Sequence, residues 1–427
     1  MRDIPHKNLG LKRIYMYVYV FSLIYIEFGY AMVVANKLSG NVRTLALLLL
    51  TVPIMFFNGR VTVDRSRVLL LLFLSVVIFF NLIKDNTYEN YILLLVPICI
   101  GFVIATFLDI KTVLAVFSNI MLFLAAYSLI SFAISLVLPG AVLWLPVLGN
   151  RLRTSAIVHD AVFSVVLSNA KYFRNYGIAW EPGAFALLLC IAAFYEMNIA
   201  EKISIKRVFV IISAIVTTFS TMGYIVLMAM VLSSISKRKA LHNRSNGTSV
   251  VVLAALVLVM CLLPANAKEL VFSKLDGLFF EGTGTFAYTT QARLNAIKYP
   301  FEAFVSSPIF GVGYDRFSVV NRTLCNGVAT NTVLNWFAVM GLLFGLPCVV
   351  GYLKAVLRVS NFVGYGLFAK ALIIIASLLL ISTESLLRIS LVYTIIFCGY
   401  GRNHFIEEND KSAISLHSGG VQTESVG

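Results

Sequence analysis

Long apolar runs alternate with short polar segments along almost the whole chain. Runs that approach 20 residues match the hydrocarbon core of a bilayer, about 30 Å thick. The pattern predicts about twelve membrane-spanning helices, at residues 14–35, 44–57, 68–83, 91–108, 112–138, 177–195, 206–219, 223–236, 249–264, 331–352, 366–382 and 388–400. No strand pattern of consequence interrupts them, so we expect an all-α, polytopic integral membrane protein with a single transmembrane domain over residues 1–400.

The apolar stretch at residues 206–236 could also be one long helix. Basic clusters flank it at both ends, and a single span would place them on opposite sides of the membrane. Lysine and arginine are enriched in cytoplasmic loops, and serine, threonine and glycine at residues 220–223 are able to interrupt a helix. The sequence therefore predicts two short spans with a break between them.

Basic residues also set the orientation. Four of the first thirteen residues are Lys or Arg, which places the amino terminus in the cytoplasm. The run at 14–35 is too long for a signal-peptide core, so it is expected to be a retained span. An even number of spans returns the carboxyl terminus to the cytoplasm, where the polar, Ser/Gly-rich residues 401–427 are expected to form a disordered tail.

Composition strengthens the membrane interpretation: 59% of the residues are hydrophobic and 13% are charged, with a mean hydropathy of +0.89. The net charge of +14 lies between the spans and not on one soluble face, so no nucleic-acid partner is indicated. It fits the positive-inside rule, an anionic lipid or phosphate substrate, or both. The six cysteines have neither disulfide nor metal spacing, and no metal site is predicted.

Two long loops, at 139–176 and 265–330, fall on the outer side and carry the candidate chemistry. The arginine guanidinium stays charged and matches the geometry of phosphate oxygens, so arginines in these loops are candidate substrate ligands. They are Arg151, Arg153, Arg174, Arg293, Arg316 and Arg322. The alternative for any one of them is a solvated loop residue or a contact with a lipid headgroup.

Glu181 stands where the sixth predicted span begins, followed by Pro182 and Gly183. A carboxylate at this depth is costly unless it is paired or faces a cavity. Two interpretations remain open: an interfacial glutamate paired with Arg174, or a general base or hydroxyl-binding group. Glu384 and Arg388, four residues apart at another outer span edge, either are functional candidates or simply pair with each other.

Several other features have structural alternatives. Glu27 lies within a predicted span and is a functional candidate for that reason. The turn at Gly311–Tyr314 either is an ordinary tight turn or presents backbone N–H groups to an anion. Gly341 and Gly345 form a GxxxG pattern that favours helix packing. His159 and Asp160 are adjacent, with no nucleophile placed beside them.

Taken together, these residues resemble the bacterial O-antigen polymerase family, which belongs to a larger group that also contains the O-antigen ligases. The resemblance covers roughly residues 170–350. Three segments carry it: Arg174 with Gly177 and Glu181–Phe185; Thr218–Tyr224; and Arg293 with Ser307–Tyr314, followed by Asn331 and Gly341.

The resemblance implies a metal- and cofactor-independent membrane glycosyltransferase of the bacterial inner membrane. Such an enzyme joins undecaprenyl-pyrophosphate-linked oligosaccharides at the periplasmic face, in contact with membrane lipid. A chain-length regulator and a flippase of the same pathway are candidate partners. By position, Glu181 and Arg293 would be catalytic, and the substrate-binding residues would be Arg174, Arg151, Arg153, Tyr314, Arg316, Arg322 and Asn331.

Two alternatives remain open at this stage. A ligase moves the polymer onto lipid A core. Ligases typically have a histidine immediately before the position that Asn331 matches, and this chain has Thr330 in place of that histidine. A flippase or transporter would more often show repeated halves and short outer loops, which this chain lacks.

Overall fold

The computed structural model describes residues 7–57, 63–85, 88–150, 156–170, 173–238, 285–325 and 330–401. The predicted span at 249–264, residues 402–427, and both Arg151 and Arg153 lie outside these ranges. Each of the other predicted spans contains a helix. The helices are α1 (Lys7–Phe28), α2 (Tyr30–Val33), α3 (Gly40–Thr51), α4 (Ile54–Phe57), α5 (Arg65–Lys84), α6 (Tyr88–Phe107), α7 (Ile110–Val137), α8 (Pro139–Val142), α9 (Pro182–Asn198), α10 (Ile205–Thr217), α11 (Thr221–Arg238), α14 (Thr285–Ser306), α15 (Gly313–Thr323), α16 (Thr332–Val363), α17 (Leu367–Ser382) and α18 (Ser390–Tyr400).

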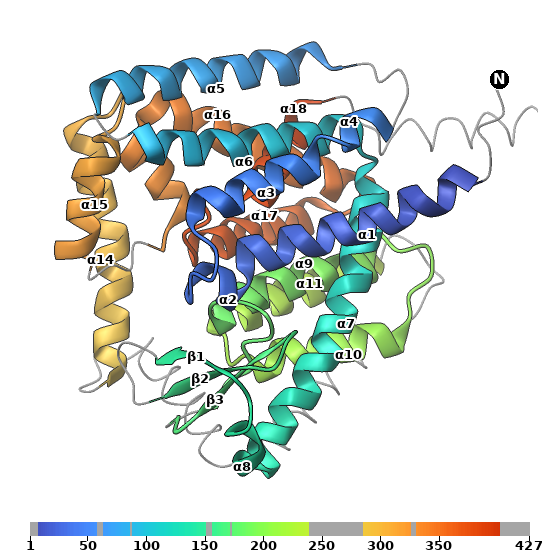
Figure 1. Ribbon diagram of the computed structural model, residues 1–427. Helices are drawn as coiled ribbons and strands as arrows, with labels where there is room; N and C mark the ends of the chain where they lie inside the picture. Colours follow the sequence, from blue (N-terminus) through green and yellow to red (C-terminus); the bar gives the residue numbers. More distant parts are fainter. Residues whose placement is uncertain are drawn as a thin grey trace, which may run out of the picture.

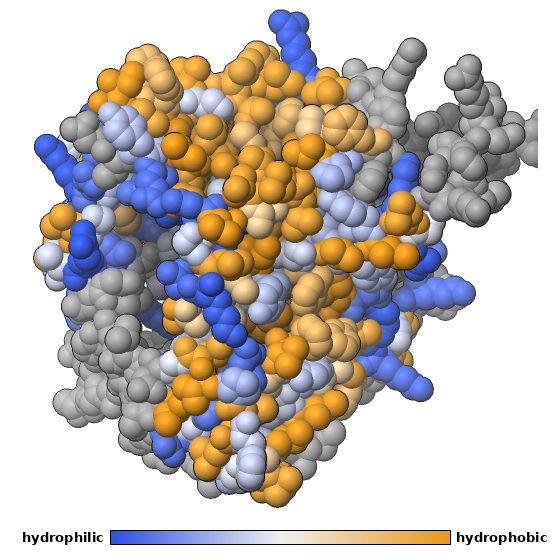
Figure 2. Space-filling model, in the orientation of Figure 1, coloured by the Kyte–Doolittle hydropathy of each residue, from blue (hydrophilic) through white to orange (hydrophobic). Residues whose placement is uncertain are grey.

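Among the described residues, α5, α6, α7 and α16 are long and apolar enough to cross a membrane, and several shorter apolar helices accompany them. One face of α5 leaves large apolar side chains exposed, namely Leu69, Leu72, Phe73, Val76, Phe79, Phe80 and Ile83. Figure 2 shows that apolar side chains cover much of this side of the molecule. Exposed apolar area of this extent marks a surface that contacts lipid, so the chain is a membrane protein.

The helices form a bundle in which α18 is central. Figure 1 shows α1, α3, α5 and α6 running beside one another, whereas α7 and α14 cross the bundle. Helix α18 packs against α5, α6 and α16. The loop predicted at 265–330 contains two helices among its described residues, α14 and α15.

Both ends of α18 are bound by charged side chains from other helices. The carboxylate of Glu27 accepts a hydrogen bond from Ser390 N at 2.9 Å, at the start of the helix. At its end, Arg67 Nε donates to Phe397 O at 3.2 Å and Arg358 Nη1 donates to Cys398 O at 2.7 Å. An acidic group at the amino end of α18 and basic groups at its carboxyl end complement the helix macrodipole. Glu27 therefore has a structural role as a helix cap.

The predicted break within 206–236 is confirmed. Helix α10 ends at Thr217 and α11 begins at Thr221, with Phe219 in the left-handed region at φ 51°. The break lies slightly earlier than predicted because the segment before α9 binds the freed carbonyls. Asn175 N donates to Thr217 O at 2.9 Å, and its side-chain amide donates to Thr217 Oγ1 at 3.0 Å.

The expectation of an all-α fold was wrong in one respect. The loop at 139–176 contains a three-stranded antiparallel sheet in the order β1 (Val147–Asn150), β2 (Ile157–Asp160) and β3 (Val165–Ser168). Within it, His159 is buried, and its ring nitrogens contact Leu145 O at 3.0 Å and Ser168 Oγ at 2.8 Å. His159 is thus a structural residue of the sheet.

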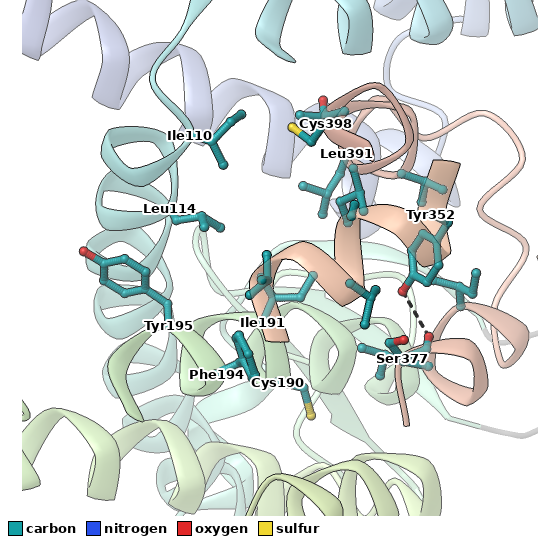
Figure 3. Close-up of a pocket in the computed structure, with 18 of the residues that line it drawn as sticks. Ile110, Leu114, Cys190, Ile191, Phe194, Tyr195, Tyr352, Ser377, Leu391 and Cys398 are labelled. Carbon is teal, nitrogen blue, oxygen red and sulfur yellow. Dashed lines mark hydrogen bonds between the residues drawn. The ribbon is translucent and has the colours of Figure 1, made fainter. Parts of the chain in front are cut away.

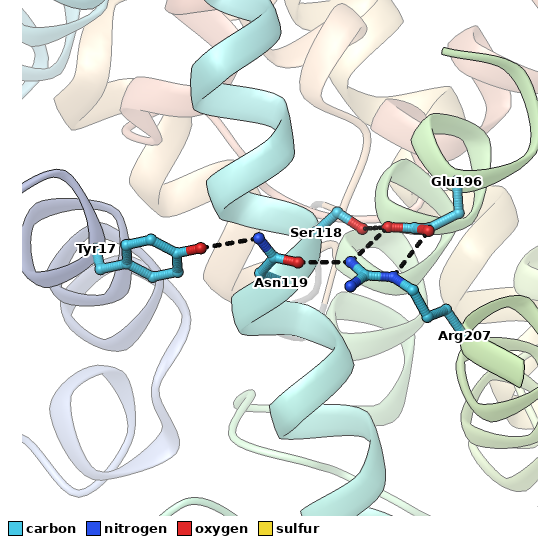
Figure 4. A network of polar contacts seen from close by, with 5 residues as sticks. All are labelled: Tyr17, Ser118, Asn119, Glu196 and Arg207. Atoms are coloured by element: carbon cyan, nitrogen blue, oxygen red, sulfur yellow. Dashed lines mark hydrogen bonds and ion pairs between the residues drawn. The ribbon is translucent and has the colours of Figure 1, made fainter. Parts of the chain in front are cut away.

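A polar network ties four helices together (Figure 4). Arg207 of α10 forms a two-pronged ion pair with Glu196 of α9, at 2.7 and 2.9 Å. Ser118 and Asn119 of α7 add hydrogen bonds at 2.5 and 2.6 Å, and Asn119 donates to Tyr17 OH of α1 at 2.8 Å. Glu196 is buried, so these partners compensate its lost hydration.

Candidate functional site

The segment before α9 is held by strand-like pairing with the end of α1. Tyr30 N donates to Ile178 O at 2.9 Å, and Trp180 N donates to Phe28 O at 3.0 Å. The rings of Phe28 and Trp180 stack with their centroids 5.1 Å apart. Pro182 then begins α9 with the φ that a first helical turn requires. This arrangement fixes the backbone of Glu181, the residue that precedes the helix.

Glu181 lies beside a second glutamate, Glu384, from the loop between α17 and α18. A methyl group at Gly183 would lie 2.5 Å from Glu384 Oε1 and 3.6 Å from Glu181 Oε1, so glycine leaves room for both carboxyl groups. The two side chains share a hydrogen bond. Glu384 is 3% exposed, whereas Glu181 is partly open to solvent.

Burial is the main cause that raises the pKa of Glu384 well above its ordinary value. The charge of Glu181 and the hydrogen bond between the two carboxyl groups raise it further. A hydrogen bond from Trp180 and the charge of Arg293 act in the opposite direction. Two adjacent carboxylate charges repel each other, so the pair favours a state in which one proton is kept.

The loop that carries Glu384 is fixed by the start of α16. The hydroxyl of Thr332 donates to Glu384 O and accepts from Leu386 N at 2.8 Å. Asn331, predicted to bind substrate, caps the same helix, since its Oδ1 accepts from Leu334 N at 3.0 Å. The structure thus gives Asn331 a supporting position behind Glu384.

Arg293 is exposed on α14, and its charge reaches the Glu384 carboxyl. Of the two residues that the sequence suggested as catalytic, Glu181 lies beside Glu384, and the charge of Arg293 acts on the Glu384 carboxyl. The alternative in which Glu384 pairs with Arg388 was wrong. Arg388 Nη2 donates to Asn90 Oδ1 at 2.7 Å instead.

The turn at residues 307–314 docks into a kink of α16 at Gly341, whose φ is 71°. Leu342 N donates to Pro308 O, and Val312 N donates to Ala338 O, both at 2.8 Å. The GxxxG interpretation of helix packing was therefore wrong for Gly341. At Gly341 the backbone of α16 departs from helical geometry, so the turn can form hydrogen bonds with the α16 backbone there.

Replacing Gly341 by alanine is expected to displace this turn. The added methyl would lie 2.2 Å from Ile309 O, and the left-handed φ adds about 1 kcal/mol of strain. The matched control is Gly364→Ala, which has φ 77° but no atom within 4 Å of the added methyl. We expect a clearly lower midpoint of thermal unfolding for Gly341→Ala than for Gly364→Ala. Equal midpoints would contradict the docking argument.

The anion that meets the Gly311–Tyr314 turn is a carboxylate of the protein itself. Asp85, at the end of α5, accepts from Asp315 N at 3.3 Å and from Tyr91 OH at 2.9 Å. Because Gly313 lacks a side chain, this carboxylate can approach the start of α15. A charged acceptor at a helix amino terminus is stabilising, so the turn has a structural partner.

Tyr314, a predicted substrate ligand, is buried. The Tyr91 ring meets it edge-on with centroids 5.1 Å apart, and the Arg388 guanidinium lies 5.1 Å from its centroid. Burial raises the pKa of Tyr314. The Tyr314 side chain lies between the turn and the bundle, where it has a supporting role for the candidate site.

Of the other predicted arginines, those that the structure describes contact backbone or are exposed on α15. Arg174 Nε and Nη2 donate to Thr218 O and Phe219 O at 3.0 and 3.2 Å, so Arg174 caps α10. Arg316 and Arg322 are exposed on α15, and Arg322 Nη2 donates to Ser318 Oγ at 3.2 Å.

An apolar cavity of about 250 Å³ lies between α7, α9, α11, α16, α17 and α18. Figure 3 shows Leu114, Ile191 and Leu391 around it. Phe28, which stacks on Trp180, and Leu386, two residues beyond Glu384, also line it. The cavity therefore adjoins the carboxyl pair at one end, and its walls suit a hydrocarbon chain.

Within the described residues, no group of three or more His, Cys, Asp or Glu side chains could hold a metal ion. No protein-family model matches the chain, and no curated protein sequence matches it significantly.

Proposed function

We propose that the protein is a polysaccharide polymerase of the O-antigen polymerase type. It would join undecaprenyl-pyrophosphate-linked oligosaccharide repeats at the periplasmic face of the bacterial inner membrane. One observation supports this most strongly: Glu181 adjoins Glu384, the charge of Arg293 acts on Glu384, and Leu386, two residues beyond Glu384, lines an apolar cavity among apolar helices. A carboxyl base, a cation for phosphate and a hydrocarbon site are what this reaction needs.

In the proposed reaction, an acceptor hydroxyl attacks the anomeric carbon of the donor sugar. The new C–O bond forms as the bond to pyrophosphate breaks, and the leaving pyrophosphate takes the bonding electrons. Arg293 would stabilise the charge that develops on it. Glu181 would accept the proton of the attacking hydroxyl. The polyprenyl chain of a lipid-linked substrate would occupy the apolar cavity.

The function is tested by deleting the gene and examining cell polysaccharide on a gel. We expect deletion to leave core carrying at most one repeat, and the wild-type gene to restore the ladder. An unchanged ladder would contradict the proposal. Core without any attached repeat would favour the alternatives, an O-antigen ligase or, second, a flippase for lipid-linked oligosaccharides. Purified protein supplied with lipid A core separates these two, since only a ligase uses it as acceptor.

A further inference from the structure

We infer that Glu384 is a positioning residue that holds a proton and donates it in a hydrogen bond to Glu181, so that Glu181 alone acts as the ionised base. This inference rests on the proposed function and deepens it. The two glutamates come from different elements: Glu181 precedes α9, and Glu384 lies between α17 and α18.

Unequal exposure assigns the two roles. Glu384 is 3% exposed and lies behind Glu181, whereas Glu181 is partly open to solvent. Burial disfavours a charged carboxylate, so the proton of the pair belongs on the buried member. The more exposed member keeps its charge and can reach an acceptor hydroxyl.

The surroundings of Glu384 hold its carboxyl group in place. Its backbone carbonyl is bound by Thr332, and Gly183 lies against its Oε1 without a side chain to displace it. The charged groups that face it are Glu181 and, through its charge, Arg293. Arg388 on the same loop instead contacts Asn90 and the Tyr314 ring.

The shared proton has a consequence for the base. The hydrogen bond that the protonated Glu384 carboxyl donates occupies one lone pair of the Glu181 carboxylate. It orients the other Glu181 oxygen toward solvent. When Glu181 takes the acceptor proton, its charge is neutralised and Glu384 is still neutral. The proton then leaves from Glu181 to solvent, which restores the singly protonated pair.

The sign of the pH dependence follows from this assignment. Glu384 carries its proton below its raised pKa, and the arrangement is then intact. As pH rises through that pKa, the proton is lost, two negative charges adjoin, and the donor to Glu181 disappears. The proposal therefore predicts an alkaline limb in the pH profile of kcat that belongs to Glu384.

Two variants of Glu384 separate the proposal from a purely structural role. Glutamine retains an N–H donor toward Glu181, whereas alanine removes it. In vesicles supplied with lipid-linked repeats from cells lacking the gene, we expect Glu384→Gln to lower kcat by less than about tenfold and to lose the alkaline limb. Glu384→Ala should lose more than about tenfold. A Glu384→Gln protein that is folded yet as inactive as Glu181→Gln would overturn the inference.

A spectroscopic test needs no substrate and so separates this inference from the proposed function. In purified protein at neutral pH, the infrared difference spectrum of wild type minus Glu384→Gln should show the carbonyl band of a protonated carboxyl group. The spectrum of wild type minus the exposed control Glu302→Gln should lack that band. A wild type minus Glu384→Gln spectrum without the band would overturn the inference even if the protein polymerises sugars. The band, together with no ladder formed by wild type or any variant, would count against the proposed function alone.

Discussion

Replacing Glu181 by glutamine is expected to abolish the polysaccharide ladder, with a loss of rate of about 10²- to 10⁴-fold. Glutamine has nearly the same shape, so the pairing of residues 178–180 with the end of α1 should persist. The amide cannot take the acceptor proton. The measurements are ladder length in complemented cells and the rate of chain extension in vesicles.

The matched control for this substitution is Glu302→Gln. Glu302 lies exposed on α14 and pairs with Lys298 at 4.0 Å, away from the described carboxyl pair. Its replacement should leave the ladder unchanged. If Glu181→Gln folds normally and also leaves the ladder unchanged, Glu181 is not the base, and its position at the start of α9 has only a structural meaning.

Replacing Arg293 by alanine is the second substitution with a large expected effect. Loss of the guanidinium removes the cation proposed to stabilise the pyrophosphate leaving group, at a cost of about 10²- to 10³-fold in kcat. Arg293→Lys keeps the charge but not the planar fork, so it should recover part of the activity. The rate in vesicles as a function of donor concentration distinguishes an effect on kcat from an effect on KM.

Lys298→Ala is the control for Arg293, since it removes a positive charge from the same helix. Lys298 is exposed and its described contacts are with Glu302 and the Tyr299 ring. We expect its substitution to have little effect. Equal losses from Arg293→Ala and Lys298→Ala would show that the overall charge of α14 matters, and not a specific contact of Arg293.

Much of the helical layout could be predicted because membrane insertion acts on local sequence. The two short helices within 206–236 followed from flanking charge alone, with no knowledge of their packing. The position of the break could not be predicted so well. It depends on Arg174 and Asn175, whose bonds to the carbonyls at 217–219 are tertiary contacts.

The sheet escaped prediction for a different reason. Its strands have four residues each, and β3 (Val165–Ser168) is buried along its whole length. A strand buried on both faces lacks the alternation of apolar and polar residues by which strands are recognised. Such a run cannot be distinguished from a short apolar loop segment.

The candidate site was predictable only in part. Glu181 stood out because charge is rare at the edges of apolar runs, and Arg293 stood out because of its place in the family resemblance. The partner of Glu384 could not be predicted, because Arg388 is its neighbour in sequence whereas Glu181 belongs to a distant segment. The contacts of Tyr314 and Asn331 could not be predicted for the same reason. Both are polar residues of the segments that carry the resemblance, but in the structure they contact other parts of the protein.

The charged caps of α18 bear on how the protein is made. This helix has 11 residues, about 17 Å, which is too short to cross a bilayer unaided. Its caps, Glu27, Arg67 and Arg358, all precede it in the chain, so the ribosome completes them first. Docking of α18 then draws in the loop that carries Glu384. A nascent chain therefore acquires the complete carboxyl pair only when α18 docks, and before that step Glu27 and Arg358 lack the backbone partners that α18 supplies.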